Sequence, residues 1–81
     1  MKKSEFKDTD LDKKIKLVLE NGYYVDKRET PTFSIDLYSL DGFFVEVLYS
    51  TTNKWVEDIE IVENKNTLDI YLQEIQLHEL F

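Results

Sequence analysis

The sequence predicts an α+β protein in which four β-strands lie between two helices, in the order α-β-β-β-β-α. Three observations lead to this fold class: a helical apolar stripe near the N-terminus, two closely spaced turns within residues 33–61, and a second helical stripe after residue 64. Short connections favour antiparallel pairing of neighbouring strands. We therefore expect an antiparallel meander sheet of three to four strands, with both helices packed on one face.

The N-terminal part predicts a loose lead-in followed by a helix. Residues 1–8 are polar apart from Phe6. A helix is expected to begin near Thr9, because Thr and Asp are good N-cap residues. Its apolar residues have helical spacing, and Gly22 is a typical stop signal. These apolar residues are Leu11, Ile15, Val18 and Leu19. Residues 23–29 then read as an edge strand with charged residues on one side.

The centre of the chain predicts two β-hairpins. A two-residue Asp41-Gly42 turn would scatter the apolar residues over both sides of the sheet. A three-residue loop with Gly42 in the left-handed conformation gathers them on one face, and Asn53 repeats this role in the second turn. That register predicts one core face made of Phe33, Ile35, Leu37, Phe43, Val45, Val47, Tyr49, Trp55, Ile59 and Ile61.

The C-terminal part predicts a second helix with apolar residues on two sides. Leu68, Tyr71, Leu72 and Ile75 form the stripe expected to face the sheet. A second stripe of Ile70, Leu77 and Phe81 falls on nearly the opposite side. A helix with one face on a sheet is normally polar on the other. We therefore expect this second stripe to be an interaction surface, most simply in a two-fold homodimer.

Length and composition predict one cytoplasmic domain over residues 1–81. The chain contains no cysteine and no long apolar run, which argues against disulfides, a transmembrane helix and a signal peptide. Glycine occurs only at positions 22 and 42, so there is no phosphate-binding loop. The only histidine is His78, near the end of the predicted second helix. We therefore expect no cofactor and name no catalytic residue.

Charge is unevenly distributed along the chain. Residues 1–28 carry eight basic and six acidic side chains, whereas residues 29–81 carry two basic and eleven acidic ones. The net charges of these segments are +2 and −9, which sum to the −7 of the whole chain. Nucleic-acid binding through the sheet is not expected, because phosphate contacts need lysine and arginine.

The three-residue turns also predict a row of carboxylates on the outer face of the sheet. Asp36 would stand opposite Glu46, and Glu46 opposite Asp58. Like charges in this position repel each other unless something compensates them. The row has three interpretations: a solvated face, a contact for a basic partner, or a weak site for a cation or acid–base catalysis. Four apolar residues would flank it as a contact surface, namely Tyr38, Phe44, Leu48 and Val56.

The sequence therefore predicts a small acidic protein that acts by binding rather than by catalysis. The first hypothesis is a protein-interaction or self-association module. The second is a cation-binding protein or small enzyme that uses Asp36, Glu46 and Asp58. The third is an inhibitor or immunity-type protein that presents its acidic surface to a basic target. No nucleic-acid or membrane partner is expected.

Overall fold

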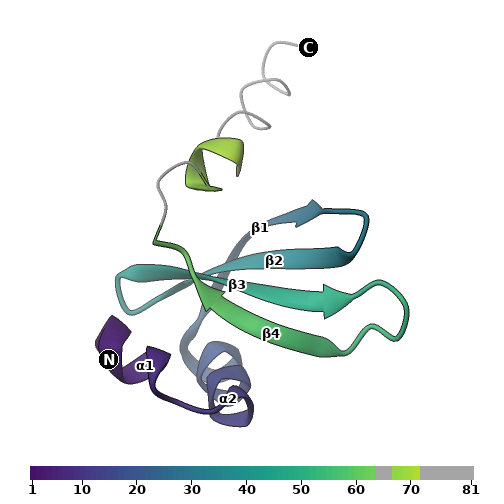
Figure 1. Cartoon of the computed structure of the whole chain (residues 1–81). Helices are drawn as coiled ribbons and strands as arrows, with labels where there is room; N and C mark the ends of the chain where they lie inside the picture. The colour runs from purple at the N-terminus through teal and green to yellow at the C-terminus, as the bar shows by residue number, and fades with distance from the viewer. Residues whose placement is uncertain (64–66, 72–81) are drawn as a thin grey trace.

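The structure is built on a four-stranded antiparallel sheet with the strand order β1-β2-β3-β4 (Figure 1). The computed structural model describes residues 1–63 and 67–71. The strands are β1 (Tyr23–Glu29), β2 (Phe33–Leu40), β3 (Phe43–Ser50) and β4 (Val56–Ile61). The predicted α+β class and antiparallel meander are confirmed.

Two helices precede the sheet, α1 (Lys3–Lys7) and α2 (Leu11–Asn21). Asp10 caps α2, because its carboxylate accepts a hydrogen bond of 2.9 Å from the backbone N–H of Lys13. The helix ends at Asn21, and Gly22 is its C-cap. A side chain at Gly22 would collide with the backbone, because an added Cβ would lie 2.6 Å from the carbonyl oxygen of Val18. The expected loose lead-in is not found, because Phe6 in α1 is completely buried.

The first β-hairpin uses the two-residue turn, and the predicted three-residue loop is wrong. Leu40 pairs directly with Phe43 across Asp41 and Gly42. Both turn residues have positive φ angles, 47° at Asp41 and 87° at Gly42. A turn with two positive φ angles matches the right-handed twist of the flanking strands, and Asp-Gly is one of the few dipeptides that adopt it readily.

The second β-hairpin also differs from the prediction. The residue with positive φ is Lys54, at 62°, rather than Asn53. The side-chain oxygen of Asn53 instead accepts a hydrogen bond of 2.9 Å from the backbone N–H of Trp55. The loop contains four residues, since the backbone N–H of Ser50 donates to the carbonyl of Trp55 at 3.0 Å. Trp55 is 74% exposed and does not join the core.

These turns divide the predicted single core face between the two sides of the sheet. We call the sides the α2 face and the Glu46 face. The α2 face carries Tyr38, Leu40, Phe43, Val45, Val47, Tyr49, Ile59 and Ile61, together with Asp36. The Glu46 face carries Phe33, Ile35, Leu37, Phe44, Glu46 and Leu48. A change of turn length by one residue moves one strand by one position against its neighbour, which sends alternate side chains to the other side.

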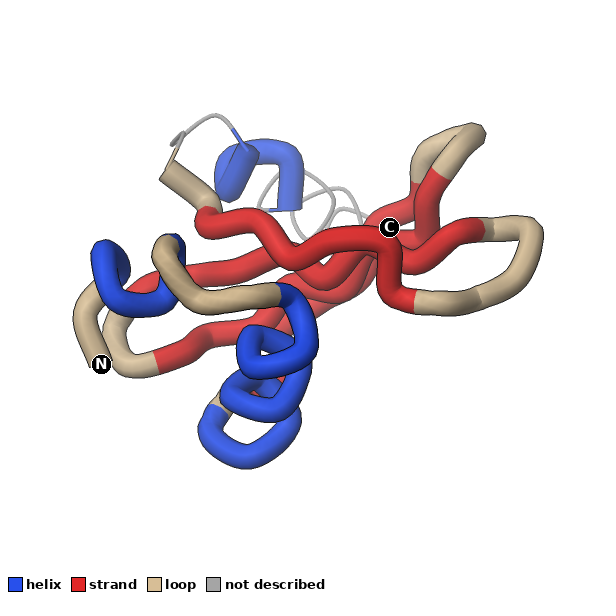
Figure 2. The backbone as a smooth tube through the Cα atoms, turned by 60° about the horizontal axis from the view of Figure 1, so that its bottom comes forward, coloured by secondary structure: helices blue, strands red, loops and turns tan. Residues whose placement is uncertain are grey.

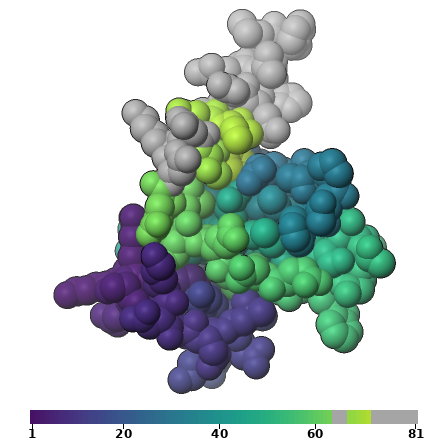
Figure 3. Space-filling model, viewed as in Figure 1, coloured from purple at the N-terminus to yellow at the C-terminus, as the bar shows by residue number. Residues whose placement is uncertain are grey.

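Both faces contribute buried residues. On the α2 face, Phe6 and Val18 from the helices join Leu40, Phe43, Val45, Val47 and Ile59 in one apolar cluster. On the Glu46 face, Ile35 and Leu37 are 4% and 2% exposed. Residues 67–71 are helical and lie on this second side of the sheet, opposite α1 and α2 (Figures 1, 2 and 3). Packing of both predicted helices on one face is therefore not confirmed.

The two edge strands carry the same local irregularity. The pairing register shifts between Tyr24 and Asp26 in β1, and in β4 next to Asp58. In each strand the aspartate carboxylate accepts a hydrogen bond from the backbone N–H of the next residue, at 2.7 Å for Lys27 and 2.8 Å for Ile59. Bulges and edge charges discourage further strands from adding to a sheet.

Candidate functional site

The predicted carboxylate row is not formed, because it depended on the incorrect turn register. Asp36 pairs with Val47 and Lys27, which places its side chain on the α2 face. Glu46 pairs with Leu37 and Glu60 on the opposite side of the sheet. Asp58 pairs with Leu48 and shares the side of Glu46. Within residues 1–63 and 67–71 there is no group of three acidic or histidine side chains arranged to hold a metal ion.

The predicted apolar contact surface is divided in the same way. Tyr38 and Val56 lie on the α2 face, whereas Phe44 and Leu48 lie on the Glu46 face. Ile70, from the predicted second stripe of the C-terminal helix, is 43% exposed. The other two members of that stripe, Leu77 and Phe81, lie outside the described residues.

Glu46 forms a closed polar network on its own face. Its carboxylate is buried, with 6% of the residue exposed. The oxygen Oε2 accepts hydrogen bonds from Nε of Arg28 at 2.9 Å and from the hydroxyl of Tyr71 at 2.6 Å. The guanidinium carbon of Arg28 lies 5.9 Å from the centre of the Tyr71 ring. The hydrogen bond to Glu46 raises the pKa of Arg28. The pKa of the Tyr71 hydroxyl is also raised, mainly by burial and next by the hydrogen bond to Glu46.

This network fastens the C-terminal segment to the sheet. Arg28 belongs to β1, Glu46 to β3, and Tyr71 to the helical residues 67–71. The ion pair joins β1 to β3 across β2, where Ile35 and Leu37 are buried. A buried carboxylate with a guanidinium and a phenol as partners is well satisfied. We therefore interpret the Glu46 network as structural.

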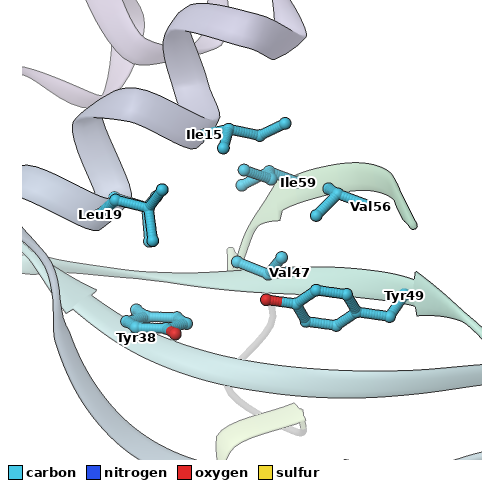
Figure 4. A pocket seen from close by; sticks show the side chains of 8 residues that line it. Ile15, Leu19, Tyr38, Val47, Tyr49, Val56 and Ile59 are labelled. Atoms are coloured by element: carbon cyan, nitrogen blue, oxygen red, sulfur yellow. The ribbon is translucent and has the colours of Figure 1, made fainter. Parts of the chain in front are cut away.

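The α2 face contains an apolar pocket between α2 and the sheet. Its walls come from α2, β2, β3 and β4, and they consist of Ile15, Val18, Leu19, Tyr38, Val47, Tyr49, Val56 and Ile59. In Figure 4, Leu19 projects from the helix toward Tyr38, and the tyrosine rings lie along the floor. The cavity volume is about 20 Å³, which is little more than the space that one water molecule occupies. The pocket is too small for a metabolite.

A larger polar hollow adjoins this pocket at Tyr49, which lines both. It is formed by Lys27, Glu29, Ser34, Asp36, Tyr49, Ser50, Thr51 and Lys54. Its volume is about 550 Å³, within the range of roughly 300–1,000 Å³ that is common for small-ligand sites. The hollow lies beyond the apolar cluster on the α2 face, at the end of the sheet where β2 begins and β3 ends.

Three tyrosines lie near Asp36, the carboxylate of this region that forms no ion pair within the described residues. We call Asp36 with Tyr24, Tyr38 and Tyr49 the tyrosine groove. The rings of Tyr24 and Tyr38 meet edge to face with their centres 5.7 Å apart. Partial burial, together with the nearby charge of Asp36, raises the pKa of all three hydroxyls.

Asp36 itself lacks a partner within the described residues. Partial burial raises the pKa of Asp36, and the positive charge of the neighbouring Lys27 offsets only part of this increase. The ammonium of Lys27 lies 3.8 Å from the carboxylate of Glu29 instead. Within residues 1–63 and 67–71, no ion pair and no hydrogen bond reaches the Asp36 side chain.

Sequence reasoning placed Asp36 and Tyr38 on one face of the sheet but did not bring Tyr49 beside them. In the predicted register these residues lay on an outer face, whereas Tyr49 lay in the core. A signal was present, since Asp36 and Tyr38 are two residues apart on one strand and must share a face. The missing information was the register of β3, which places Tyr49 on the same side.

Comparisons with protein-family models, with curated proteins and with solved structures found no match to this chain. No helix within the described part of the chain is long and apolar enough to cross a membrane.

Proposed function

We propose that this chain is a small non-enzymatic module that binds another protein through the tyrosine groove and the apolar pocket beside it. The observation that carries the proposal is the combination of exposed aromatic and apolar side chains with one unpaired carboxylate on a preformed concave surface. Tyr24 in the groove is 57% exposed, and Leu19 beside it is 74% exposed. Tyrosine is among the residues enriched in protein interfaces.

The edges of the sheet are a poorer place for a partner than its face. A partner that extends the sheet needs a regular edge with free backbone groups. Both edge strands are bulged, and the aspartates in them already occupy one backbone N–H each. The α2 face presents side chains instead.

Charge supports a basic partner segment. Residues 29–81 carry a net charge of −9. The hollow itself is lined by two lysines and two carboxylates, so the attraction for a basic segment comes from the surrounding surface and from Asp36. Complementary charge speeds encounter and discourages acidic competitors. The proposal thus joins the first and third hypotheses from the sequence: an interaction module that takes a basic target.

The test is binding of a purified partner to matched variants. The tagged chain is first used to find proteins that co-purify in stoichiometric amounts, and the leading one is then purified and titrated by calorimetry. Leu19→Glu places a charge beside the groove. Tyr23→Glu is the control, because Tyr23 is similarly exposed at 77% and projects from β1 on the other face.

We expect the Leu19→Glu variant to bind the partner at least about tenfold more weakly, because a desolvated apolar contact is lost. The Tyr23→Glu variant should bind like the wild type. Equal binding by all three proteins would contradict the proposed function, as would equal loss in both variants.

Self-association is a second candidate function, and the exposure of Ile70 favours it. Ile70 is 43% exposed on the helical residues 67–71, while its neighbour Tyr71 is buried. A two-fold contact is the most common way to cover such a surface. Sedimentation at near-millimolar concentration should then show a dimer for the wild type and a monomer for Ile70→Lys. A monomeric wild type would remove this candidate.

A further inference from the structure

The Glu46 network shows how this chain satisfies a carboxylate that lies beside a tyrosine. The guanidinium of Arg28 donates to Glu46 at 2.9 Å and lies 5.9 Å from the centre of the Tyr71 ring. The guanidinium therefore has two partners at once, an anion and an aromatic ring. Arginine suits this role because it is planar, weakly hydrated and always charged.

The tyrosine groove repeats two of these three parts. It holds the carboxylate of Asp36 and the ring of Tyr49 in one hollow. No guanidinium is present, since the only arginine of the chain is Arg28, which is committed to Glu46. Lys27 and Lys54 line the same hollow, but neither forms an ion pair with Asp36.

We propose that the groove binds an arginine side chain of the partner protein, with its guanidinium paired to Asp36 and packed on the ring of Tyr49. The inference rests on the proposed function, because it assigns the chemistry by which the same groove recognises its partner. The bound arginine supplies the third part of the arrangement that Arg28 completes on the Glu46 face.

Other cations fit the groove less well. Calcium and magnesium ions take six or more oxygen ligands, usually with several carboxylates, whereas the hollow offers one unpaired carboxylate. A lysine ammonium is a strongly hydrated point charge with no planar surface for a ring. A guanidinium can form two parallel hydrogen bonds to a carboxylate and still present a face to an aromatic ring.

The test is a nuclear magnetic resonance titration with a blocked Gly-Arg-Gly peptide at about 0.15 M ionic strength, where long-range charge effects are largely screened. The same peptide with citrulline replaces the guanidinium by a neutral group of nearly the same shape. The protein variants are Asp36→Asn in the groove and Glu60→Gln as the control. Glu60 is exposed on the other face, and its replacement changes the net charge equally.

We expect saturable shifts at Asp36, Tyr38 and Tyr49, with a dissociation constant on the order of millimolar for a single side chain. Asp36→Asn should weaken binding about tenfold or more, because the charged hydrogen bonds are lost. Glu60→Gln should bind like the wild type, and the citrulline peptide should not saturate. The pKa of Asp36 should fall when the arginine peptide is bound.

Tyr49 supplies a second test. Tyr49→Phe keeps the ring and should retain binding, whereas Tyr49→Leu should weaken it. Equal loss in Asp36→Asn and Glu60→Gln would overturn the proposal, since it would show diffuse attraction to an acidic surface. Equal binding of the citrulline peptide, or no saturable shift in the groove, would overturn it as well.

The two proposals can fail separately. If Leu19→Glu releases the purified partner but the arginine peptide does not bind the groove, the interaction function stands and the arginine assignment is wrong. If the arginine peptide saturates the groove but Leu19→Glu keeps the partner, the groove recognises guanidinium but is not the partner's docking surface.

Discussion

The two faces of the sheet treat a tyrosine-flanked carboxylate in opposite ways. On the Glu46 face, the carboxylate is buried, bonded to Arg28 and Tyr71, and covered by residues 67–71. On the α2 face, Asp36 is half-buried beside three tyrosines and has no such partner within the described residues. The first arrangement is complete, whereas the second is open.

The difference indicates that, in this small domain, one face contributes polar contacts to stability and the other face is available for binding. A complete polar network is hard to disturb without loss of the fold, because its members are left buried without partners. An incomplete one contributes little to the fold and is free to accept a ligand. We therefore expect substitutions on the two faces to change the free energy of unfolding by different amounts. For the two carboxylates, we expect the changes to differ in sign.

The largest effect is expected in the apolar cluster of the α2 face. Phe6 is completely buried, and its ring meets Phe43 edge to face at 5.7 Å. Phe6→Ala should lower the free energy of unfolding by about 3–5 kcal/mol, because it leaves a cavity. Urea unfolding measures this loss. A change below about 1 kcal/mol would mean that α1 is not packed on the sheet.

The next effect is expected in the Glu46 network. Tyr71→Phe keeps the ring and removes the hydroxyl that donates to Glu46 at 2.6 Å. A hydrogen bond to a charged group contributes about 1.5–3 kcal/mol, so the free energy of unfolding should fall by that amount. The same urea titration applies, with Tyr24→Phe as the control because that ring is 57% exposed. Equal, small changes in both would show that residues 67–71 are not fastened to the sheet.

The sequence predicted the elements of the fold better than their register. The α+β class, the antiparallel meander and the helix capped near Thr9 followed from apolar spacing and turn residues. The register failed because one covered face was assumed, and that assumption favoured a three-residue turn over the Asp41-Gly42 turn. Both faces carry buried apolar residues, so the scattered apolar pattern was the correct one.

The candidate site was only partly predictable for the same reason. Asp36 was named as a weak candidate, but its predicted neighbours Glu46 and Asp58 lie on the other side of the sheet. Tyr49 lies on the same face as Asp36 because the pairing of β3 with β2 differs by one position from the predicted register. The partners of Glu46 are separated from it by 18 and 25 residues in the sequence. Local sequence patterns do not predict contacts between residues so far apart in the chain.

The backbone conformation of the first turn can be tested by substitution. Gly42 has a φ angle of 87°, and no atom would contact an added Cβ. Gly42→Ala should therefore lower the free energy of unfolding by about 1 kcal/mol through backbone strain alone. Asp41→Asn, which tolerates a positive φ, should cost less. An unchanged stability in Gly42→Ala would contradict the left-handed backbone conformation at position 42.

A smaller effect is expected in the pH dependence of stability. Burial raises the folded-state pKa of Asp36 above its ordinary value of 3.8, and Lys27 offsets part of this shift. The folded state then binds the proton more tightly than the unfolded chain, so the contribution of Asp36 to stability falls as pH rises from 3.8 through the folded-state pKa. The other titratable side chains near Asp36 are Lys27, Glu29, Lys54 and the three tyrosines of the groove.

Urea unfolding of the wild type and Asp36→Asn across this pH range measures that contribution. The stability of the variant relative to the wild type should increase as pH rises and then level off above the folded-state pKa. A relative stability that decreases as pH rises would show that Asp36 is held by a positive partner, and the α2 face would then be as complete as the Glu46 face.

The most direct measurement compares the two carboxylates at neutral pH. Glu46→Gln and Asp36→Asn each replace one charge by an amide of nearly the same shape, and equilibrium unfolding gives both free energies. We predict that Glu46→Gln lowers the free energy of unfolding by about 2 kcal/mol or more, since Arg28 loses its buried partner. Asp36→Asn should leave it unchanged or raise it, because a partly desolvated charge without a partner is removed. A loss in Asp36→Asn as large as that in Glu46→Gln would contradict the distinction between a complete and an open face.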